Sequence, residues 1–319
     1  MAVYVNTNYS ALQGQRYLGN VQNSLTTTYQ RLSSGMRINS AKDDAAGLQI
    51  ADRLTSQING LNQGNRNASD GIALAQTIEA GMDEISGMLQ KMRTLTVQAA
   101  NGTNTTQDRT AIGKEIESLA NEVSRIAMKT TYAGKTVLNG DIAGSIYGDQ
   151  AANQGDPAGK AGTMTLQVGS NKGDTISFGM DSVIFSKLGT SQHLFATDGS
   201  KLFKTGADGS VAVDMSKLDY SNAAADTYVG NAIELFDKMI ATIDGKRADL
   251  GALQNRLESS IRNQSNVAAN EADARSRIRD ADFAEESANL SQQSIIQQAA
   301  ASMLMQANTR PQLGLSLLG

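Results

Sequence analysis

The side chains that could carry out chemistry are few in this sequence. Its one histidine, His193, lies in the run SQHLF without an acidic residue or a second imidazole beside it, so we interpret it as a solvated or packed side chain. The adjacent Asp43 and Asp44 could bind a metal or act as an acid pair, but a salt bridge or a charge at a helix start explains them better. The patterns HExxH and GxxxxGK[ST] are absent. The sequence therefore predicts no enzyme activity, no cofactor and no metal site.

Composition and charge exclude further classes of protein. The formal net charge is −4 and there is no basic arm, so we expect no nucleic-acid partner. The 319 residues include no cysteine, which excludes disulfides and a cysteine nucleophile. The chain has no run of about 18 apolar residues, and its first residues lack the basic start and apolar core of a secretory signal. We expect no membrane insertion, and either a cytosolic protein or one exported without a cleaved signal peptide.

Long stretches have the apolar spacing of packed helices. From Gly47 to Ala100 apolar residues alternate at three and four positions. Over roughly seven heptads this spacing predicts a helix of about 80 Å. Similar spacing recurs at residues 112–126 and 236–261, and residues 283–308 carry two apolar rows. Pro157 and Pro311 lie outside these segments, so no proline is expected inside a helix.

The middle of the sequence, about residues 141–228, has a different character. Helical spacing disappears, glycine is frequent, and residues 163–168, 174–180 and 182–188 are rich in residues that favour strands. The dipeptides Asp198-Gly199 and Asp208-Gly209 predict hairpin turns. We therefore expect a small, separate β-rich domain.

The order of these segments predicts a mainly α fold with an inserted β domain. The N- and C-terminal parts would form a long coiled-coil-like helical bundle. The expected parts are terminal helices at 1–44 and 279–319 with spacers at about 33–46 and 270–280, an outer bundle at 45–140 and 229–278, and a β-rich surface domain at 141–228. Residues 270–286 would form the return spacer, with Arg275, Arg277 and Arg279 facing Asp43 and Asp44.

Two long motifs closely resemble a known family. The run RLSSGMRINSAKDDAAGLQIADRL and its continuation to residue 103 resemble the N-terminal part of bacterial flagellin. The run SRIRDADFAEESANLSQQSIIQQAAASMLMQAN resembles the C-terminal part. The similarity covers about residues 1–140 and 230–319. The middle of the chain resembles nothing that we can place.

The resemblance implies a structural subunit that self-assembles into the flagellar filament for motility. The terminal helices would form an inner tube, the long helices an outer tube, and the β domain would face outward. It also implies export through the flagellar type III apparatus to an extracellular filament. The implied partners are further copies of the chain, the flagellar cap, the hook–filament junction proteins and a cytoplasmic secretion chaperone.

The resemblance also suggests functional residues. The run LQKMRTLTVQ resembles the flagellin motif that an innate-immune Toll-like receptor recognises, which implies contacts from Lys91, Leu95 and Glu115. Receptor-competent members usually carry arginine at the position of Lys91 and often an acid at Thr94, so recognition by this chain would be weaker. We expect subunit assembly and chaperone contact at the apolar residues of the terminal segments: Leu18, Val21, Leu25, Leu32, Ile295, Ile296, Leu304, Leu317 and Leu318.

A second function is compatible with the same motifs. A hook–filament junction protein, or a secreted flagellin-like adhesin that does not form long filaments, would use similar terminal helices. The complete RLSSGMRINSAKDDAAG run and the long outer helix favour the filament subunit.

Overall fold

A computed structural model of the chain describes residues 7–140, 144–147, 162–191, 203–205, 211–214 and 225–316. The chain forms two compact units, Met1–Asn59 with Asn266–Gly319, and Gly60–Ser265. Two helices of 55 residues each, α2 (Ala45–Ala99) and α5 (Ala225–Arg279), contribute to both units. The fold is mainly helical with short strands in the middle of the sequence, which confirms the predicted fold class.

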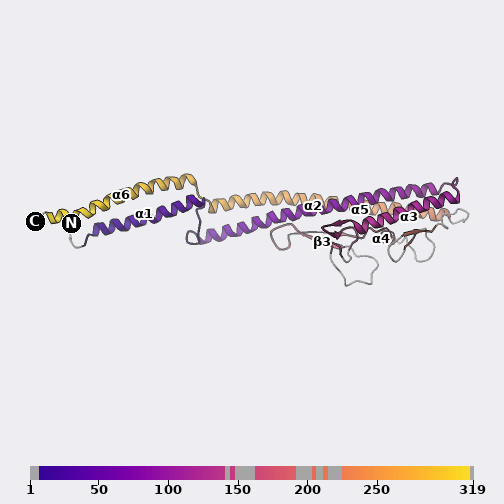
Figure 1. The fold of residues 1–319 in the computed structure, drawn as a ribbon, viewed down its shortest axis with the longest axis horizontal. Coiled ribbons are helices and arrows are strands. Elements are labelled where there is room, and N and C mark those ends of the chain that lie inside the picture. Colours follow the sequence, from indigo (N-terminus) through magenta and orange to yellow (C-terminus); the bar gives the residue numbers. More distant parts are fainter. Residues whose placement is uncertain are drawn as a thin grey trace. The chain divides into compact units, whose positions relative to one another are not determined.

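The first unit contains the two terminal helices, α1 (Tyr9–Ser34) and α6 (Phe283–Ser316), which lie side by side (Figure 1). Helix α1 begins at Asn8, whose Oδ1 accepts a hydrogen bond from the Ala11 N–H at 3.1 Å. It ends at Gly35, whose φ of 68° lies in the left-handed region that glycine adopts without steric cost. Helix α6 begins after Asp282, whose Oδ1 accepts from the Ala284 N–H at 2.8 Å. Polar side chains therefore define where both terminal helices begin.

The return spacer is shorter than the sequence predicted. Helix α5 continues to Arg279, so the break before α6 is confined to residues 280–282. The expected pairing of its arginines with Asp43 and Asp44 was wrong: Arg275 donates to the Thr55 hydroxyl at 3.4 Å, and Arg277 pairs with Asp273 at 3.0 Å. Because residues 270–279 are helical, their arginines interact with the helix itself and with its neighbour α2.

Helix α6 also extends further than predicted, because it continues through Pro311 to Ser316. Proline has no N–H, so the carbonyl of Ala307, four residues earlier, has lost its usual helical donor. The side-chain amide of Asn8 replaces that donor, with Nδ2 2.8 Å from the Ala307 oxygen. A neighbouring helix thus supplies the hydrogen bond that a proline inside a helix removes.

The second unit has a helical core. Helix α3 (Thr106–Lys129) begins with a capping box, in which Thr105 and Asp108 satisfy each other's backbone N–H groups. Apolar residues of α2, α3 and α5 are buried in one cluster. Its fully buried members include Ile78, Met82, Ile85, Leu89 and Met92 of α2, Ile116 and Val123 of α3, and Phe236, Met239 and Ile243 of α5. The predicted apolar spacing therefore corresponds to the core-facing side of each helix.

Three short antiparallel strand pairs accompany these helices within the described residues. They are β1 (Thr131–Tyr132) with β2 (Lys135–Thr136), β3 (Gly162–Gln167) with β4 (Thr175–Met180), and β5 (Phe203–Thr205) with β6 (Val211–Val213). The strands predicted at 163–168 and 174–180 are confirmed as β3 and β4. The dipeptides Asp198-Gly199 and Asp208-Gly209 lie outside the described residues, as does His193.

The strand predicted at 182–188 was wrong. Residues 185–191 form helix α4 (Phe185–Ser191), in which the Ile184 carbonyl accepts from the Leu188 N–H at 2.9 Å. Phe185 is fully buried, and its ring lies 5.4 Å from that of Phe203 and 6.3 Å from that of Phe236. A helical turn brings Phe185 and Leu188 to the same side of the segment, where both reach the core, whereas a strand would have alternated its side chains between two faces.

The described strands share the core of the helices. Leu166, Val168 and Met180 are buried in the same cluster as α2, α3 and α5. Helix α2 admits the β3–β4 hairpin through small residues: a Cβ at Gly64 would lie only 2.1 Å from the Val168 oxygen, and one at Gly60 2.7 Å from the Ser170 Cβ. The glycines that weaken α2 as an isolated helix therefore allow this close approach. The boundaries proposed for a domain at 141–228 stay a prediction.

Candidate assembly surface

The first unit is held together by the contact between α1 and α6. Four residues of α1 were predicted as assembly residues. Leu25 is 8% exposed, and the other three, Leu18, Val21 and Leu32, are half-buried. From α6, Ile296 and Leu304 are half-buried and Ala300 is buried. A Cβ at Gly14 would lie 3.2 Å from Leu304 Cδ1, so the two helices approach closely here. Leu304 thus packs against α1, and the other predicted assembly residues named here are buried or half-buried in the single chain.

Polar contacts fix the register of this helix pair at both ends, with two of them at the end where α1 stops and α6 begins. Asn8 bonds the Ala307 carbonyl, Thr28 Oγ1 donates to Gln293 Oε1 at 3.3 Å, and Arg31 Nη1 lies 2.9 Å from Glu286 Oε1. The Glu286 side chain is only 8% exposed. Because a carboxylate is costly to bury without a partner, the ion pair with Arg31 favours this register over shifted ones.

The second apolar row of α6 has no cover in the single chain. Ile295 is 67% exposed and Met303 is 70% exposed, although both belong to the apolar rows predicted from the sequence. Other large apolar side chains of α1 and α6 are also exposed: Tyr9, Leu12, Tyr17, Tyr29, Phe283 and Met305. Exposed apolar side chains gathered on one helix pair are typical of a protein–protein contact surface. Leu317 and Leu318 lie outside the described residues.

The RLSSGMRINSAKDDAAG segment joins this helix pair to the first turns of α2. Arg37 N–H donates to the Arg279 carbonyl at 2.7 Å, and the Gly35 carbonyl accepts from the Ala281 N–H at 3.0 Å. Ile38 is 2% exposed and acts as the apolar anchor of the segment. The two connections, 35–44 and 280–282, are therefore bonded to each other.

The two carboxylates of this segment stabilise turns. Asp43 Oδ2 accepts from the Ser40 N–H, the Ser40 hydroxyl and the Asn39 N–H, at 2.9, 3.0 and 3.1 Å. These bonds, the backbone bond from Ser40 first among them, lower the pKa of Asp43 below its ordinary value. Asp44 Oδ1 accepts from the Gly47 N–H at 2.9 Å, at the start of α2. The helix-start role predicted for this carboxylate pair is thus observed for Asp44.

Comparison with known proteins matches the terminal regions of the chain. Residues 5–143 match the bacterial flagellin N-terminal helical region, and residues 233–318 match the bacterial flagellin C-terminal helical region. The chain is 36% identical to flagellin A of Vibrio cholerae and 37% identical to flagellin D of Vibrio anguillarum, with 100% of both chains covered in each comparison. The chain belongs to the bacterial flagellin family. As a flagellin it is a structural subunit of the bacterial flagellar filament.

A solved structure supports the fold of this flagellin. A protein of Vibrio parahaemolyticus described as flagellar hook-associated matches it with a TM-score of 0.57 and 16% identity, over 75% of this chain and all of that one. At this identity the likeness concerns the fold alone. The two relatives named above, which match over the full length, are flagellins. The junction-protein alternative is therefore not better supported than the filament subunit.

The three residues of this flagellin suggested for receptor contact lie in the second unit. Lys91 Nζ on α2 forms an ion pair with Glu115 Oε1 on α3 at 2.8 Å, and both side chains are about half exposed. Leu95, one turn after Lys91, is half-buried against the core. The structure thus brings Lys91 and Glu115 into contact across two helices, an arrangement that the sequence could not show.

Nothing in the described part of this flagellin forms a site for metal chemistry. Within that part, no group of three or more metal-ligating side chains comes together. The carboxylates near the helix connections are engaged in turns and ion pairs, as described above for Asp43, Asp44 and Glu286.

No helix among the described residues is long and apolar enough to cross a bilayer.

Proposed function

We propose that the exposed apolar face of α1 and α6 forms the subunit contacts of a homopolymeric, extracellular flagellar filament. The observation that carries this proposal is the row of Ile295 and Met303, which are 67% and 70% exposed in the single chain. Burial of one such side chain contributes about 1.5–3 kcal/mol, so several together can offset the entropy that the copies lose when they associate. In this arrangement Leu18, Val21, Leu25, Leu32, Ile296 and Leu304 hold the helix pair together and Ile295 contacts other copies.

The same exposed surface requires protection before assembly. Several large apolar side chains exposed on a single chain favour aggregation, so a cytoplasmic secretion chaperone that covers α6 fits this flagellin. Export through the flagellar type III apparatus without a cleaved signal peptide, growth under the cap and attachment to the hook–filament junction proteins complete the proposal. We further propose that the chain has no enzymatic role, because the family is structural.

Recognition of the monomer by an innate-immune Toll-like receptor is the second part of the proposal. Lys91, Leu95 and Glu115 would provide the contacts, and the observed Lys91–Glu115 pair holds the two charges together on the surface of α2 and α3. Lysine lacks the planar fork of arginine, so Lys91→Arg should increase receptor signalling while Lys91→Ala abolishes it. Arg125→Ala, which removes an exposed ion pair with Glu122 elsewhere on α3, is the matched control and should leave signalling unchanged.

Seeded growth tests the assembly function directly. Purified chain is mixed with short fragments of its own filaments and followed by negative-stain electron microscopy. We expect the fragments to lengthen with time. Monomers that bind the fragment ends without elongating them would contradict the proposal and favour the junction protein.

A further inference from the structure

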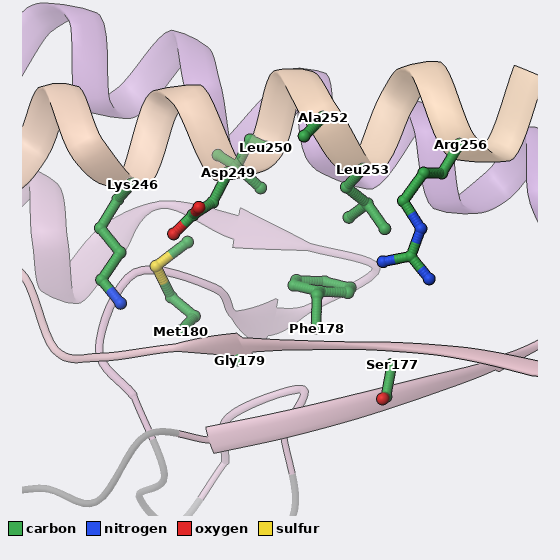
Figure 2. Close-up of a pocket in the computed structure, with 10 residues that line it drawn as sticks. All are labelled: Ser177, Phe178, Gly179, Met180, Lys246, Asp249, Leu250, Ala252, Leu253 and Arg256. Carbon is green, nitrogen blue, oxygen red and sulfur yellow. The ribbon is translucent and has the colours of Figure 1, made fainter.

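A small hollow lies between strand β4 and helix α5 in the second unit (Figure 2). Its volume is about 250 Å³. The floor is apolar: Met180, Leu250 and Leu253 are at most 4% exposed, and the half-buried ring of Phe178 lies beside them. The ring of Phe178 is the part of this floor that is most accessible from solvent, and it offers a surface for another apolar group.

The rim of this groove is charged. Figure 2 shows Lys246 and Arg256 of α5 extending toward β4 at opposite ends of the groove, with Asp249 between them. Lys246 forms an ion pair with Asp181 at 2.7 Å. Arg256 is exposed and has no ion-pair partner among the described residues, so its charge is available to a bound group. An apolar group with a carboxylate beside it fits the apolar floor and the unpaired charge of Arg256.

The size of the groove points to a side chain as its occupant. Sites for small organic ligands usually enclose about 300–1,000 Å³ and cover most of the ligand. This groove is smaller and partly open to solvent. It therefore suits one large side chain from a second protein. In a filament, that protein is another copy of the same chain.

One exposed side chain of this flagellin has the matching chemistry. Among the exposed aromatic residues of the described part, Tyr9, Tyr17 and Tyr29 lie in a segment, residues 1–42, that contains no Asp or Glu. Phe283 is 59% exposed and lies in the run DADFAEE, where Asp280, Asp282 and Glu285 are exposed. Phe283 thus combines an exposed aromatic ring with carboxylates within three residues.

We propose that Phe283 of one copy inserts into the groove between β4 and α5 of a second copy, with the carboxylates that neighbour Phe283 lying next to Arg256. This inference rests on the proposed assembly. The inserting residue and the groove are different surfaces, so a head-to-tail use of the contact leaves one Phe283 and one groove free at the ends of the assembly. Where its rotation does not close a ring, such a contact continues into an open polymer, as a filament requires.

Cross-linking tests the contact, because the chain has no native cysteine. Filaments are grown from equal amounts of Ala284→Cys copies and Ala252→Cys copies and treated with a copper oxidant, which removes one hydrogen from each thiol as the disulfide forms. Ala284 is the exposed neighbour of Phe283, and Ala252 lines the groove. Each copy has one cysteine, so a 284–252 disulfide joins two copies. The matched control is Ala241→Cys, at an exposed position on about the same side of α5 and three turns away.

We expect the 284–252 peptide by mass spectrometry in filaments and not in dilute monomer, and little of the 284–241 peptide. Absence of the 284–252 disulfide, or equal amounts of both, would overturn the inference while leaving filament formation, and so the proposed function, intact. Failure of the unmodified chain to extend seeds would instead contradict the proposed function itself.

A mutant cycle provides an independent measurement. Phe283→Ala removes the inserted ring and Ala252→Trp fills the groove, and both positions are exposed, so the monomer should keep its circular dichroism and melting temperature. Each change should raise the critical concentration for polymerisation roughly tenfold to a hundredfold. The critical concentration of the double variant should be no higher than that of the more severe single variant, because both changes remove the same contact. Additive effects, or no effect of either change, would show that the two positions do not meet.

Discussion

The Asn8 side chain makes two hydrogen bonds: its Oδ1 caps α1 at the Ala11 N–H, and its Nδ2 donates to the Ala307 carbonyl of α6 at 2.8 Å. The second bond replaces the one that Pro311 cannot make. One residue therefore begins one terminal helix and completes the other.

Asn8→Ala should loosen the terminal helix pair more than loss of an ordinary cap. The cap alone contributes about 0.5–2 kcal/mol, and the bond to Ala307 adds about 1 kcal/mol. Hydrogen exchange of the α1 and α6 amides measures the effect. In a Pro311→Ala background the helix regains its own N–H at position 311. Asn8→Ala should then remove only the stabilisation that the cap of α1 contributes. An equal cost in both backgrounds would contradict the link between Asn8 and Pro311.

The two apolar rows of α6 should have separable roles. Ile296→Asp with Leu304→Asp places charges in the contact with α1, which should expose the amides of both helices in the monomer and also prevent assembly. Ile295→Asp with Met303→Asp changes side chains that are already exposed in the single chain. This variant should keep the exchange pattern of the monomer but raise the critical concentration sharply. If both double variants had the same hydrogen-exchange pattern as monomers, the two apolar rows would not have separate roles.

Two glycines of α2 should respond to alanine in opposite directions. A Cβ at Gly64 would lie 2.1 Å from the Val168 oxygen, so Gly64→Ala must displace the β3–β4 hairpin and lower the melting temperature. Gly87 has no atom within 4 Å of its Cβ position. Gly87→Ala should therefore stabilise the chain by about 1 kcal/mol through helix propensity. Thermal unfolding of both variants, followed by circular dichroism, provides the comparison.

Acid should release the turn that contains Asp43. The hydrogen bonds from Ser40 and Asn39 lower the pKa of Asp43, so the folded turn favours the ionised carboxylate. The resulting stabilisation is present above the ordinary pKa of about 3.9 and is lost as the pH falls through the lowered folded value. NMR shifts of the Ser40 amide should follow this titration. Asp43→Asn should remove the pH dependence, and a titration midpoint above the ordinary value would contradict the assignment.

Deletion of residues 141–228 should destabilise the helices that remain. A separate domain could be removed without this cost, but Leu166, Met180 and Phe185 share one core with Phe236 and Leu250. Their removal exposes apolar surface of α2 and α5. We expect a lower melting temperature and impaired assembly. Replacement of Lys172, an exposed residue of the β3–β4 loop, by alanine is the control and should change neither.

The sequence by itself determined the helices and the family. A spacing of three and four positions fixes which side of α2, α3 and α5 is apolar, because a side chain's direction along a helix follows from its position number. The runs around Arg31–Leu54 and Ser276–Asn308 carry the flagellin resemblance without any tertiary information.

Only the tertiary structure decided what each apolar row and charged residue contacts. Periodicity could not tell that the Ile296 row packs on α1 while the Ile295 row stays exposed, because both rows are equally apolar. It could not place Lys91 beside Glu115, or show that Asn8 compensates for a proline 303 positions away. The sequence pattern also predicted a strand at residues 182–188, where the structure has helix α4. A short apolar run fits either a strand or a helix, and only the core that it packs against decides between them. Pairings between distant residues depend on how the chain folds back on itself, and local sequence spacing does not contain that information.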